Sequence, residues 1–424
     1  IYNILLHLGI LITLPYYLIK AKRTGVDIRY WFGYLPPELK EKSTHKKTVW
    51  IHAVSVGEVN SVRPLIKAIK TSYPDWTIVL STITGAGQQF ARKTVKEADF
   101  IIFFPSDLPW SLHRFYRYIN PQLLLIVETE LWPNLISMAA SRSIPVALVN
   151  GSISGQSASR YRKIRWLFQP ILNLVTLFLM QSAAESDRII SFGAPPNKVI
   201  NTGNIKFDVT IPVLNDAEKQ QYVSLFGFNT TQPILLVGST HPGEETIILR
   251  VYTELLKQIP DLKMILVPRH PHRADEVSKE IESQHFTYLR RSQLDQSEIR
   301  NLQSAIILVD TVGELTKLYS LATIVFVGGS LVPIGGHNIL EPAVLGKPVL
   351  FGPYMQETID STDLLLNAGG GIQVKSEQEL IAKIATLLSH PEERQRLGEN
   401  AKSAVIANQG ATHRILDLLG NYFG

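Results

Sequence analysis

The sequence predicts an α/β protein with two doubly wound, Rossmann-like domains behind an apolar N-terminal segment. From Thr48 onward, short apolar runs alternate with helical patterns, in two blocks separated by a polar segment at 205–232. Strand–helix alternation implies parallel sheets covered by helices on both faces. The length of 424 residues also exceeds what one hydrophobic core supports, so two domains are expected.

The N-terminal segment is the first predicted element. Residues 1–19 are apolar apart from three polar positions, and the basic residues of 20–23 follow directly. That length just spans a bilayer, and a positive flank is typical of the cytoplasmic side. We therefore predict a single membrane anchor over 1–23, with all later residues cytoplasmic. The alternative is a buried helix of the first domain.

Six strands are expected in each domain. They lie at 48–54, 77–81, 100–103, 122–127, 145–149 and 176–180, and at 233–237, 263–267, 305–309, 323–327, 348–351 and 372–374. The first domain is expected over 24–210 and the second over 211–424, facing one another across a cleft. The last segment, 392–423, has a helical pattern with a break at Gln409-Gly410, and its final helix is a candidate to pack back on the first domain.

Composition excludes several classes of function. The chain has no cysteine, which excludes disulfides, thiolate catalysis and cysteine-based metal sites. Residues 1–210 carry 24 Lys and Arg against 13 Asp and Glu, which is typical of contact with membrane lipid, phosphate or another anionic partner. No zinc-finger, RNP-type or basic repeat occurs, so no nucleic-acid partner is expected. A dinucleotide-binding glycine fingerprint and a Walker A loop are absent as well.

The first candidate site residues lie in SVGE, where a predicted strand ends and a helix begins. Ser55 and Gly57 form the turn, and Glu58 opens the helix that runs to about Thr71. Free backbone N–H groups and the positive end of the helix dipole favour an ionised carboxylate. We therefore expect Glu58 to be available as a general base, with burial restoring part of its basicity. An ordinary helix-start carboxylate is the alternative.

Two more carboxylates follow the strand that ends at Val127, in ETELWPN. Alternation in an extended chain would place Glu128 and Glu130 on the same side, where they would orient an acceptor hydroxyl or pair with a cation. N-terminal charge for the following helix is the alternative. Lys206, near the predicted domain boundary, is a candidate to bind a carboxylate or phosphate, and a solvated lysine is the competing interpretation.

The second half contains four turns rich in glycine or proline, each after a predicted strand. GSTHPGEE offers Ser239, Thr240 and His241 ahead of a helix, which is typical of a phosphate cradle or of a simple N-cap. In VPRHPHR, Pro268 precedes Arg269, whose side chain is suited to bidentate binding of phosphate or carboxylate.

The other two turns lie in DTVGEL and GGSLVPIGGHNILEP. In the latter, two glycine pairs would let the backbone approach a ligand, and polar side chains follow at a helix start. An ordinary glycine-rich connection is the alternative. Because parallel strands end at one edge of a sheet, we expect all four turns to line one rim. The candidate residues of these two turns are Val312, Gly313, Glu314, Gly335, Gly336, His337, Asn338 and Glu341.

Taken together, the motifs resemble one known family. SVGE, ETELWPN, NGSISGQS, TGNIKFD, STHPGEE, VPRHPHR, DTVGEL and GGSLVPIGGHNILEP occur in the order found in 3-deoxy-D-manno-octulosonic acid (Kdo) transferases. This resemblance implies an inverting glycosyltransferase of the GT-B fold on the cytoplasmic face of the Gram-negative inner membrane. It also implies transfer of Kdo from CMP-Kdo to the lipid A precursor (lipid IVA), a tetraacylated disaccharide bisphosphate.

The resemblance assigns roles to particular residues. Glu58 matches the general base that deprotonates the acceptor's primary hydroxyl. The segments 268–269, 312–314 and 335–341 match the CMP-binding segments, with Asn338 and Glu341 as contacts to ribose and phosphate. Ser239, Thr240 and His241 would hold the donor phosphate or the Kdo carboxylate. Acceptor or sugar contacts are expected from Ser55, Gly57, Glu128, Glu130 and Lys206.

No metal and no cofactor are expected. CMP leaves as a monophosphate, whose charge backbone donors and Arg269 can meet without the metal that a diphosphate often requires. No Asp-x-Asp motif follows a strand. Three alternatives stay open: a GT-B transferase with another nucleotide-sugar donor, a sugar 2-epimerase, and a non-catalytic, membrane-anchored sugar-nucleotide-binding protein.

Overall fold

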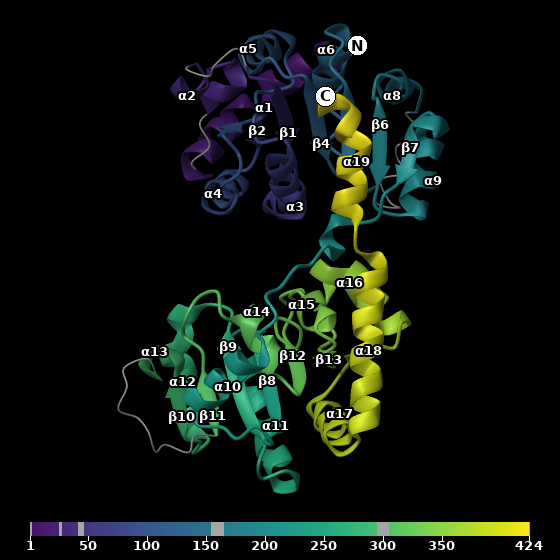
Figure 1. The fold of residues 1–424 in the computed structure, drawn as a ribbon. Coiled ribbons are helices and arrows are strands. Elements are labelled where there is room, and N and C mark those ends of the chain that lie inside the picture. The colour runs from purple at the N-terminus through teal and green to yellow at the C-terminus, as the bar shows by residue number, and fades with distance from the viewer. Residues whose placement is uncertain (1, 25–27, 41–45, 154–164, 295–304, 424) are drawn as a thin grey trace. The chain divides into compact units, whose positions relative to one another are not determined.

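The computed structural model describes residues 2–24, 28–40, 46–153, 165–294 and 305–423. Its contacts divide the chain into two compact units (Figure 1). Unit 1 comprises Ile1–Asp208 and Gln409–Gly424, and unit 2 comprises Val209–Asn408. Unit 1 is therefore discontinuous in sequence, because the chain leaves it after Asp208 and returns at Gln409.

Unit 1 is built on a seven-stranded parallel sheet in the order β3-β2-β1-β4-β5-β6-β7. The order runs one way from β1 to β3 and the other way from β4 to β7, so the topological switch point lies between β1 and β4. The strands are β1 (Thr48–His52), β2 (Thr77–Thr82), β3 (Phe100–Phe103), β4 (Leu123–Val127), β5 (Val146–Gly151), β6 (Leu177–Met180) and β7 (Val199–Asn201).

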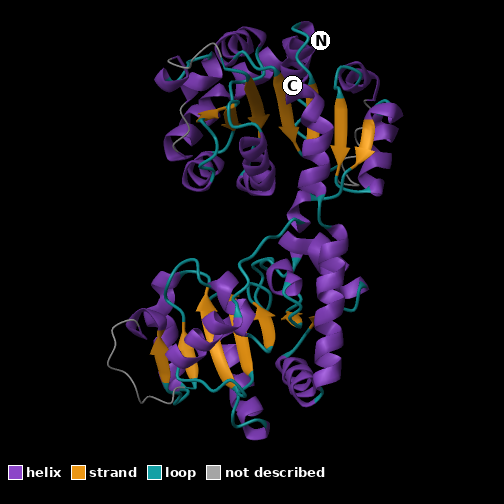
Figure 2. Cartoon of the chain, viewed as in Figure 1, coloured by secondary structure: helices purple, strands orange, loops and turns teal. Residues whose placement is uncertain are grey.

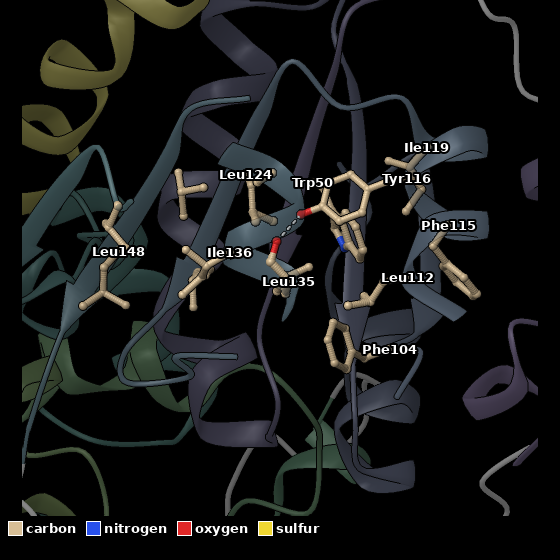
Figure 3. Close-up of a cluster of buried hydrophobic side chains, with 14 of the residues drawn as sticks. Trp50, Phe104, Leu112, Phe115, Tyr116, Ile119, Leu124, Leu135, Ile136 and Leu148 are labelled. Carbon is tan, nitrogen blue, oxygen red and sulfur yellow. Dashed lines mark hydrogen bonds between the residues drawn. The ribbon is translucent and has the colours of Figure 1, made fainter. Parts of the chain in front are cut away.

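Helices cover both faces of this sheet, which gives unit 1 a hydrophobic core on each side. In the first core, Tyr116 packs on Trp50 and its hydroxyl donates to the Leu135 carbonyl at 2.8 Å (Figure 3). The helices are α1 (Tyr2–Thr24), α2 (Pro37–Lys40), α3 (Val56–Ser72), α4 (Gly85–Thr94), α5 (Pro109–Ile119), α6 (Pro133–Ser141), α8 (Arg165–Leu172), α9 (Ala183–Phe192) and α19 (Ala411–Phe423), with 3-10 turns η1 (Ile28–Phe32), η2 (Pro196–Lys198) and η3 (Ile205–Phe207).

The C-terminal helix α19, yellow in Figure 1, belongs to unit 1. Its side chains Leu419 and Phe423 are buried in the second core together with the apolar face of α3. The Asp208 carboxylate accepts hydrogen bonds from the backbone N–H groups of Gly410 and Thr412, at 2.6 Å each. This carboxylate therefore caps the start of α19 and ties the departing segment of unit 1 to the returning one.

The N-terminal helix α1 has 23 residues. Its first turn contacts the body of unit 1, because the Tyr2 hydroxyl donates to Asp107 Oδ2 at 2.8 Å and Asn134 Nδ2 donates to Asn3 Oδ1 at 2.6 Å. Several of its apolar side chains are exposed: Ile4, Leu5, Leu8, Leu11, Ile12, Leu18 and Ile19. Within the described ranges, no helix combines the length and the apolar character needed to cross a membrane. The anchor over 1–23 stays a prediction.

Unit 2 repeats the architecture with a seven-stranded parallel sheet in the order β10-β11-β9-β8-β12-β13-β14. Its switch point lies between β8 and β12. The strands are β8 (Ile234–Thr240), β9 (Lys263–Pro268), β10 (Tyr288–Arg290), β11 (Ile306–Leu308), β12 (Ile324–Val327), β13 (Val349–Phe351) and β14 (Gly371–Gln373).

The helices of unit 2 again lie on the two faces of the sheet (Figure 2). They are α10 (Asp216–Leu225), α11 (Glu244–Gln258), α12 (Ala274–Ser283), α13 (Arg291–Leu294), α14 (Leu315–Leu318), α15 (Leu340–Val344), α16 (Ile359–Asn367), α17 (Glu377–Ser389) and α18 (Pro391–Asn408), with 3-10 turns η4 (Pro271–Arg273), η5 (Tyr319–Leu321) and η6 (Gln356–Thr358). Gly346, with φ +71°, follows the C-cap Leu345 and ends the short helix α15.

The prediction of two parallel α/β domains is confirmed, and every predicted strand overlaps an observed one. Two observed strands, β7 and β10, were not predicted. Each forms an edge of its sheet and contains only two consecutive apolar residues, Val199-Ile200 and Tyr288-Leu289, which is too short a run to indicate a strand. The predicted boundary at residue 210 compares with an observed division after Asp208.

Candidate active site

The candidate residues of unit 1 lie at the switch point of its sheet. Glu58 follows β1, and Glu128 and Glu130 follow β4, which pairs directly with β1. In unit 2, Ser239–His241 end or follow β8, and Gly328–Gly329 follow β12, its direct neighbour. In open α/β sheets, ligands bind at the carboxyl ends of the strands that flank this point. Each unit therefore offers a candidate site where its topology favours one.

Glu58 is held by its own helix start. Ser55 is the N-cap of α3; its Oγ lies 3.4 Å from Glu58 N, which donates to it, and the hydroxyl donates to Glu58 Oε1 at 3.0 Å. The Val54 backbone N–H donates to Glu58 Oε2 at 2.8 Å. The carboxylate is therefore oriented by hydrogen bonds to both oxygens, and only 8 % of the residue is exposed.

The surroundings of Glu58 favour its neutral form. Burial raises its pKa to about 7, and the nearby carboxylates of Glu130 and Glu128 add to the rise, whereas the Val54 N–H and the Ser55 hydroxyl counteract it. We had expected the helix start to favour the ionised form overall, but burial is the larger effect. A carboxylate with a pKa near 7 is well matched to general base catalysis at neutral pH.

The expectation of an extended chain at Glu128 and Glu130 is wrong. Glu128 has φ +57°, in the left-handed region, so the chain turns sharply after β4. Ser61, on α3, has its hydroxyl 3.5 Å from Glu128 Oε1, and Lys206 Nζ lies 3.9 Å from the same oxygen. The predicted pairing of this carboxylate with a cation is therefore present. Burial also raises the pKa of Glu130.

Lys206 belongs to unit 1 and lies in η3, whose N-cap Asn204 accepts the Lys206 backbone N–H at 2.9 Å. About half of its side chain is exposed, so its ammonium is available to an incoming anion as well as to Glu128. Ser55 is partly exposed and Gly57 exposed at the same helix start. Sequence reasoning therefore selected residues of unit 1 that the fold brings to one edge.

In unit 2, the last two residues of β8 include a strained backbone position and an unsatisfied hydroxyl. Ser239 has φ +61°, and the pairing register with β9 shifts between Gly238 and Thr240. Arg269 N donates to the Thr240 carbonyl at 3.0 Å, which joins the turns after β8 and β9. Thr240 Oγ1 is buried and has no hydrogen-bond partner within the described residues. Such a hydroxyl is a candidate ligand contact.

Three histidines meet beside these turns. His241 Nε2 and His337 Nε2 lie 2.8 Å apart, and the His270 ring lies 5.9 Å from that of His241 at a steep angle. Burial lowers the pKa of His337 to about 4, and Arg269, His241 and His270 contribute in the same direction. The side chain of Arg269 is exposed. This part of the rim therefore offers the Arg269 cation and imidazole nitrogens that can form hydrogen bonds.

Glu244 is a site residue that sequence reasoning missed. It is fully buried at the first position of α11, and it accepts a hydrogen bond from His241 N at 3.0 Å. Three consecutive N–H groups after β12 also donate to it, those of Gly329 (2.7 Å), Ser330 (2.9 Å) and Leu331 (2.8 Å). The carboxylate therefore fills the N–H concavity of the loop after β12 and fixes that loop to the turn after β8.

The glycines of the 328–336 loop are required by the protein itself. A Cβ on Gly335 would lie 2.5 Å from Glu357 Cγ, and one on Gly336 would lie 2.5 Å from Met355 Sδ; both have positive φ. We had attributed these glycines to close approach of a ligand, but packing within unit 2 already explains them. Beyond the loop, Asn338 Nδ2 donates to Glu341 Oε1 at 3.1 Å, and burial raises the pKa of Glu341.

The turn after β11 differs in character. Glu314 Oε1 accepts from Arg291 Nε at 3.1 Å and lies 3.1 Å from Arg291 Nη2, and the Thr311 hydroxyl donates to the other oxygen. Glu314 therefore shapes the turn through an internal ion pair. Val312, with 86 % of its surface exposed, and Gly313 project from this turn, while Pro268 is buried at the end of β9.

In the sheet order, β11, β9, β8 and β12 are consecutive, so the four turns line one rim as predicted.

Sequence reasoning also missed Arg273. This arginine is 7 % exposed and its Nη1 lies 2.7 Å from Oε1 of the fully buried Glu245, next to Glu244. Its second partner is Glu276, at 2.9 Å. The pair anchors the start of α11 under the rim. Across the described part of the chain, no group of three or more His, Asp or Glu residues is arranged to hold a metal ion.

Comparison with known proteins gives a consistent picture. Residues 28–209 match the family described as 3-Deoxy-D-manno-octulosonic-acid transferase (kdotransferase). The chain is 37 % identical to the 3-deoxy-D-manno-octulosonic acid transferase of Haemophilus influenzae, over 88 % of this chain and 87 % of that protein. It is 33 % identical to the protein of the same name from Aquifex aeolicus, over 81 % of this chain and 87 % of that one.

Among solved structures, UDP-GlcNAc 2-epimerase from Neisseria meningitidis is similar, with a TM-score of 0.57 and 17 % sequence identity. The match covers 88 % of this chain and 100 % of the epimerase chain. At that identity the likeness concerns the fold alone.

Proposed function

The chain belongs to the 3-deoxy-D-manno-octulosonic acid transferase family, and on this premise we propose that it transfers Kdo from CMP-Kdo to the lipid A precursor (lipid IVA). The proposed acceptor is the tetraacylated disaccharide bisphosphate, and the proposed general base is Glu58. As a family member the protein is a glycosyltransferase, whose product enters lipopolysaccharide. The acceptor, the inversion of configuration and the base are parts of the proposal.

The observation that carries the proposal is the environment of Glu58. Both of its oxygens are oriented by hydrogen bonds, it lies at the switch point of unit 1, and its pKa is about 7. In the proposed step, the acceptor hydroxyl oxygen attacks the anomeric carbon of Kdo and its proton moves to Glu58. The bond from that carbon to the phosphate oxygen breaks, and CMP leaves with the electron pair. A single displacement inverts the anomeric configuration.

The rim of unit 2 supports the proposed CMP-Kdo donor. A cytidine monophosphate ester and the Kdo carboxylate bring two negative charges. Arg269, the histidines 241 and 337, and the unpartnered Thr240 hydroxyl provide cationic or hydrogen-bonding groups at consecutive strand ends. Asn338 and Glu341 remain our candidates for the ribose and phosphate contacts. We propose that Lys206, Glu128 and Glu130 contact the acceptor or the sugar.

We further propose that the N-terminal segment attaches the protein to the inner membrane, with both units on the cytoplasmic face. The exposed apolar side chains of α1 support membrane attachment, since a water-exposed apolar stripe of this length is unfavourable. The basic character of residues 1–210 supports contact with an anionic lipid surface and with an acceptor that carries two phosphates.

The proposal is tested by incubating the protein with CMP-Kdo and lipid IVA and weighing the products by mass spectrometry. We expect a mass increase of one or more Kdo units, no transfer from UDP-sugars, and unchanged turnover after treatment with EDTA. Glu58→Gln should abolish transfer while CMP binding persists.

Each alternative has a distinct outcome. A transferase with another donor would turn over a UDP-sugar, a 2-epimerase would convert a UDP-sugar without any acceptor, and a non-catalytic binder would bind CMP-Kdo but yield no product. Turnover near the wild-type value in Glu58→Gln would remove Glu58 from the proposed role.

A further inference from the structure

Two histidines of unit 2 are joined directly through their ring nitrogens. His241 Nε2 and His337 Nε2 lie 2.8 Å apart, with ring planes 16° from parallel and centroids 5.0 Å apart. Atoms of rings in face-to-face contact stay about 3.5 Å apart or more. The two rings therefore meet edge to edge, in the geometry of an N–H···N hydrogen bond.

This contact restricts the protonation of both rings. One Nε2 must carry the hydrogen and the other must accept it, so in the neutral pair one Nδ1 is protonated and the other is bare. The pair can take up one further proton at the bare Nδ1 without losing the hydrogen bond. A second would put hydrogens on both Nε2 atoms and break it. His241 and His337 therefore act as one site for one proton.

The groups that surround the two histidines disfavour the extra proton, so the pair stays neutral in the ligand-free protein. Burial lowers the pKa of both histidines, most strongly that of His337, and Arg269 and His270 disfavour further positive charge on either ring. Glu244 and Glu245 act on His241 in the opposite direction, but more weakly than burial. At neutral pH the free pair is consequently neutral, and an added negative charge would raise its proton affinity.

The chemistry of the proposed donor supplies such a charge. In CMP-Kdo the phosphate is a diester with one negative charge. When the bond to the anomeric carbon breaks, the phosphate keeps the electron pair and becomes a monoester with a second pKa of about 6, so it carries close to two charges at neutral pH. An extra charge therefore forms on the leaving group at the moment of transfer, and no metal is expected to meet it.

We propose that the His241–His337 pair takes up one proton from solvent as this charge forms, and so stabilises the departing CMP. The proton removed from the acceptor goes to Glu58 and is separate from this one, which returns to solvent when CMP dissociates. This inference rests on the proposed function, because it assigns the pair to the leaving phosphate of a CMP-linked donor.

The loops that carry His241 and His337 are fixed by contacts within unit 2. Glu244 fixes the backbone N–H of His241 and the loop at Gly329 at the same time. Gly329 has φ +68°, and a Cβ there would lie 2.9 Å from His337 Cδ2, so the imidazole packs directly on that glycine. Both rings are therefore positioned by contacts that do not depend on the ligand.

The test is the number of protons that the full chain takes up on binding CMP at pH 7.5. Isothermal titration calorimetry in two buffers of different ionisation enthalpy gives this number directly. Because CMP itself is already mostly dianionic at that pH, uptake reports on the protein. We expect the wild type to take up a proton fraction approaching about one per CMP, and its CMP affinity to weaken with rising pH by up to about tenfold per unit.

Variants separate the pair from other groups. His337→Asn and His241→Asn should each remove the uptake and flatten the pH dependence of CMP affinity, and the double variant should remove no more than either alone. His337→Gln replaces His337→Asn if the latter does not fold. The control is His390→Asn, which changes an exposed histidine of unit 2 at the end of α17 and should keep the wild-type uptake.

The inference is overturned if the wild type binds CMP without proton uptake, or if the pair variants retain the wild-type uptake. Either result leaves Kdo transfer and the role of Glu58 untouched. A protein that transfers no Kdo and does not bind CMP would instead contradict the proposed function, and the inference with it.

Discussion

Two helix starts in this protein share two hydrogen bonds but have different surroundings. At Ser55–Glu58 and at Ser376–Glu379, the serine accepts the glutamate N–H, and the residue before the serine donates its own N–H to the glutamate carboxylate. Glu58 follows β1, a central strand beside the switch point, and is buried near Glu128 and Glu130. Glu379 follows β14, an edge strand, and is partly exposed. The shared pattern makes a helix cap, and the strand that precedes it decides whether the capping glutamate lies in the buried, carboxylate-rich surroundings that we propose for a base.

The largest expected effect contrasts these two glutamates directly. Glu58→Gln should lower the turnover of Kdo transfer by about 10²- to 10⁴-fold, because the amide cannot accept the acceptor's proton. Glu379→Gln should leave turnover unchanged, because it alters an equivalent cap away from the switch point. Both are measured as initial rates at saturating CMP-Kdo. Similar losses in the two variants would mean that the cap geometry, and not proton transfer, matters at Glu58.

A smaller effect is expected on the donor side. Arg269→Ala should weaken CMP-Kdo binding by about 10- to 100-fold, since a charge-assisted hydrogen bond to an anion contributes about 1.5–3 kcal/mol. Calorimetric titration gives the affinity. Arg250→Ala serves as the control, because Arg250 is an exposed arginine of unit 2 paired with Glu377 on the surface. Donor affinity that is equal in the wild type and in Arg269→Ala would exclude Arg269 from the donor site.

The pH dependence of transfer sharpens the contrast further. As the proposed base, Glu58 is active only when ionised, and its pKa in the ligand-free protein is about 7. The value of kcat/KM should therefore fall by about tenfold per pH unit well below pH 7 and level off above it. Glu128→Gln removes a neighbouring negative charge that raises this pKa, so the acidic limb should move to lower pH. An acidic limb of the pH–rate profile that lies at the wild-type pH, or at a higher pH, would contradict the electrostatic coupling of Glu128 to Glu58. Glu379→Gln should not shift it.

The smallest effect concerns the two serines. Ser55→Ala and Ser376→Ala should each lower the free energy of unfolding by about 1 kcal/mol, because each removes an N-cap. Only Ser55→Ala should also reduce turnover, since its hydroxyl orients Glu58 Oε1. Hydrogen exchange of the α3 and α17 amides measures the local stability in one experiment. Equal turnover in the two variants would show that Val54 N–H alone suffices to hold the base.

The sequence predicted the features that depend on local pattern. The strands appeared as apolar runs, and the segments that follow them contained Glu58, Glu128, Arg269 and His337. The parallel topology therefore places these residues at the carboxyl edges of the two sheets. The sign of the pKa shift of Glu58 was not predictable in this way. It depends on burial and on carboxylates about seventy positions later in the chain, which no local pattern contains.

The sequence analysis missed Glu244 and misinterpreted the loop glycines for the same reason, which is that contacts distant in the sequence decide their roles. Glu244 forms a local contact with His241, three positions earlier, which a capping pattern could have indicated. Its other donors lie more than eighty residues away in the loop after β12. The sequence indicated that the glycines of that loop allow a close approach, but it suggested a ligand as the neighbour. The actual neighbours, Met355 and Glu357, could not be identified without the folded structure.

The discontinuity of unit 1 has a consequence for biosynthesis. Leu419 and Phe423 of α19 complete one of its cores, and Asp208 caps that helix across two hundred residues of chain. During translation, the amino-terminal half emerges first but must wait for residues near position 423 before its last buried surface is covered. Unit 2 is one continuous stretch, so it can reach its native state earlier. A chain truncated directly after Asn408 would thus contain every residue of unit 2 but a unit 1 that lacks the apolar side chains of α19.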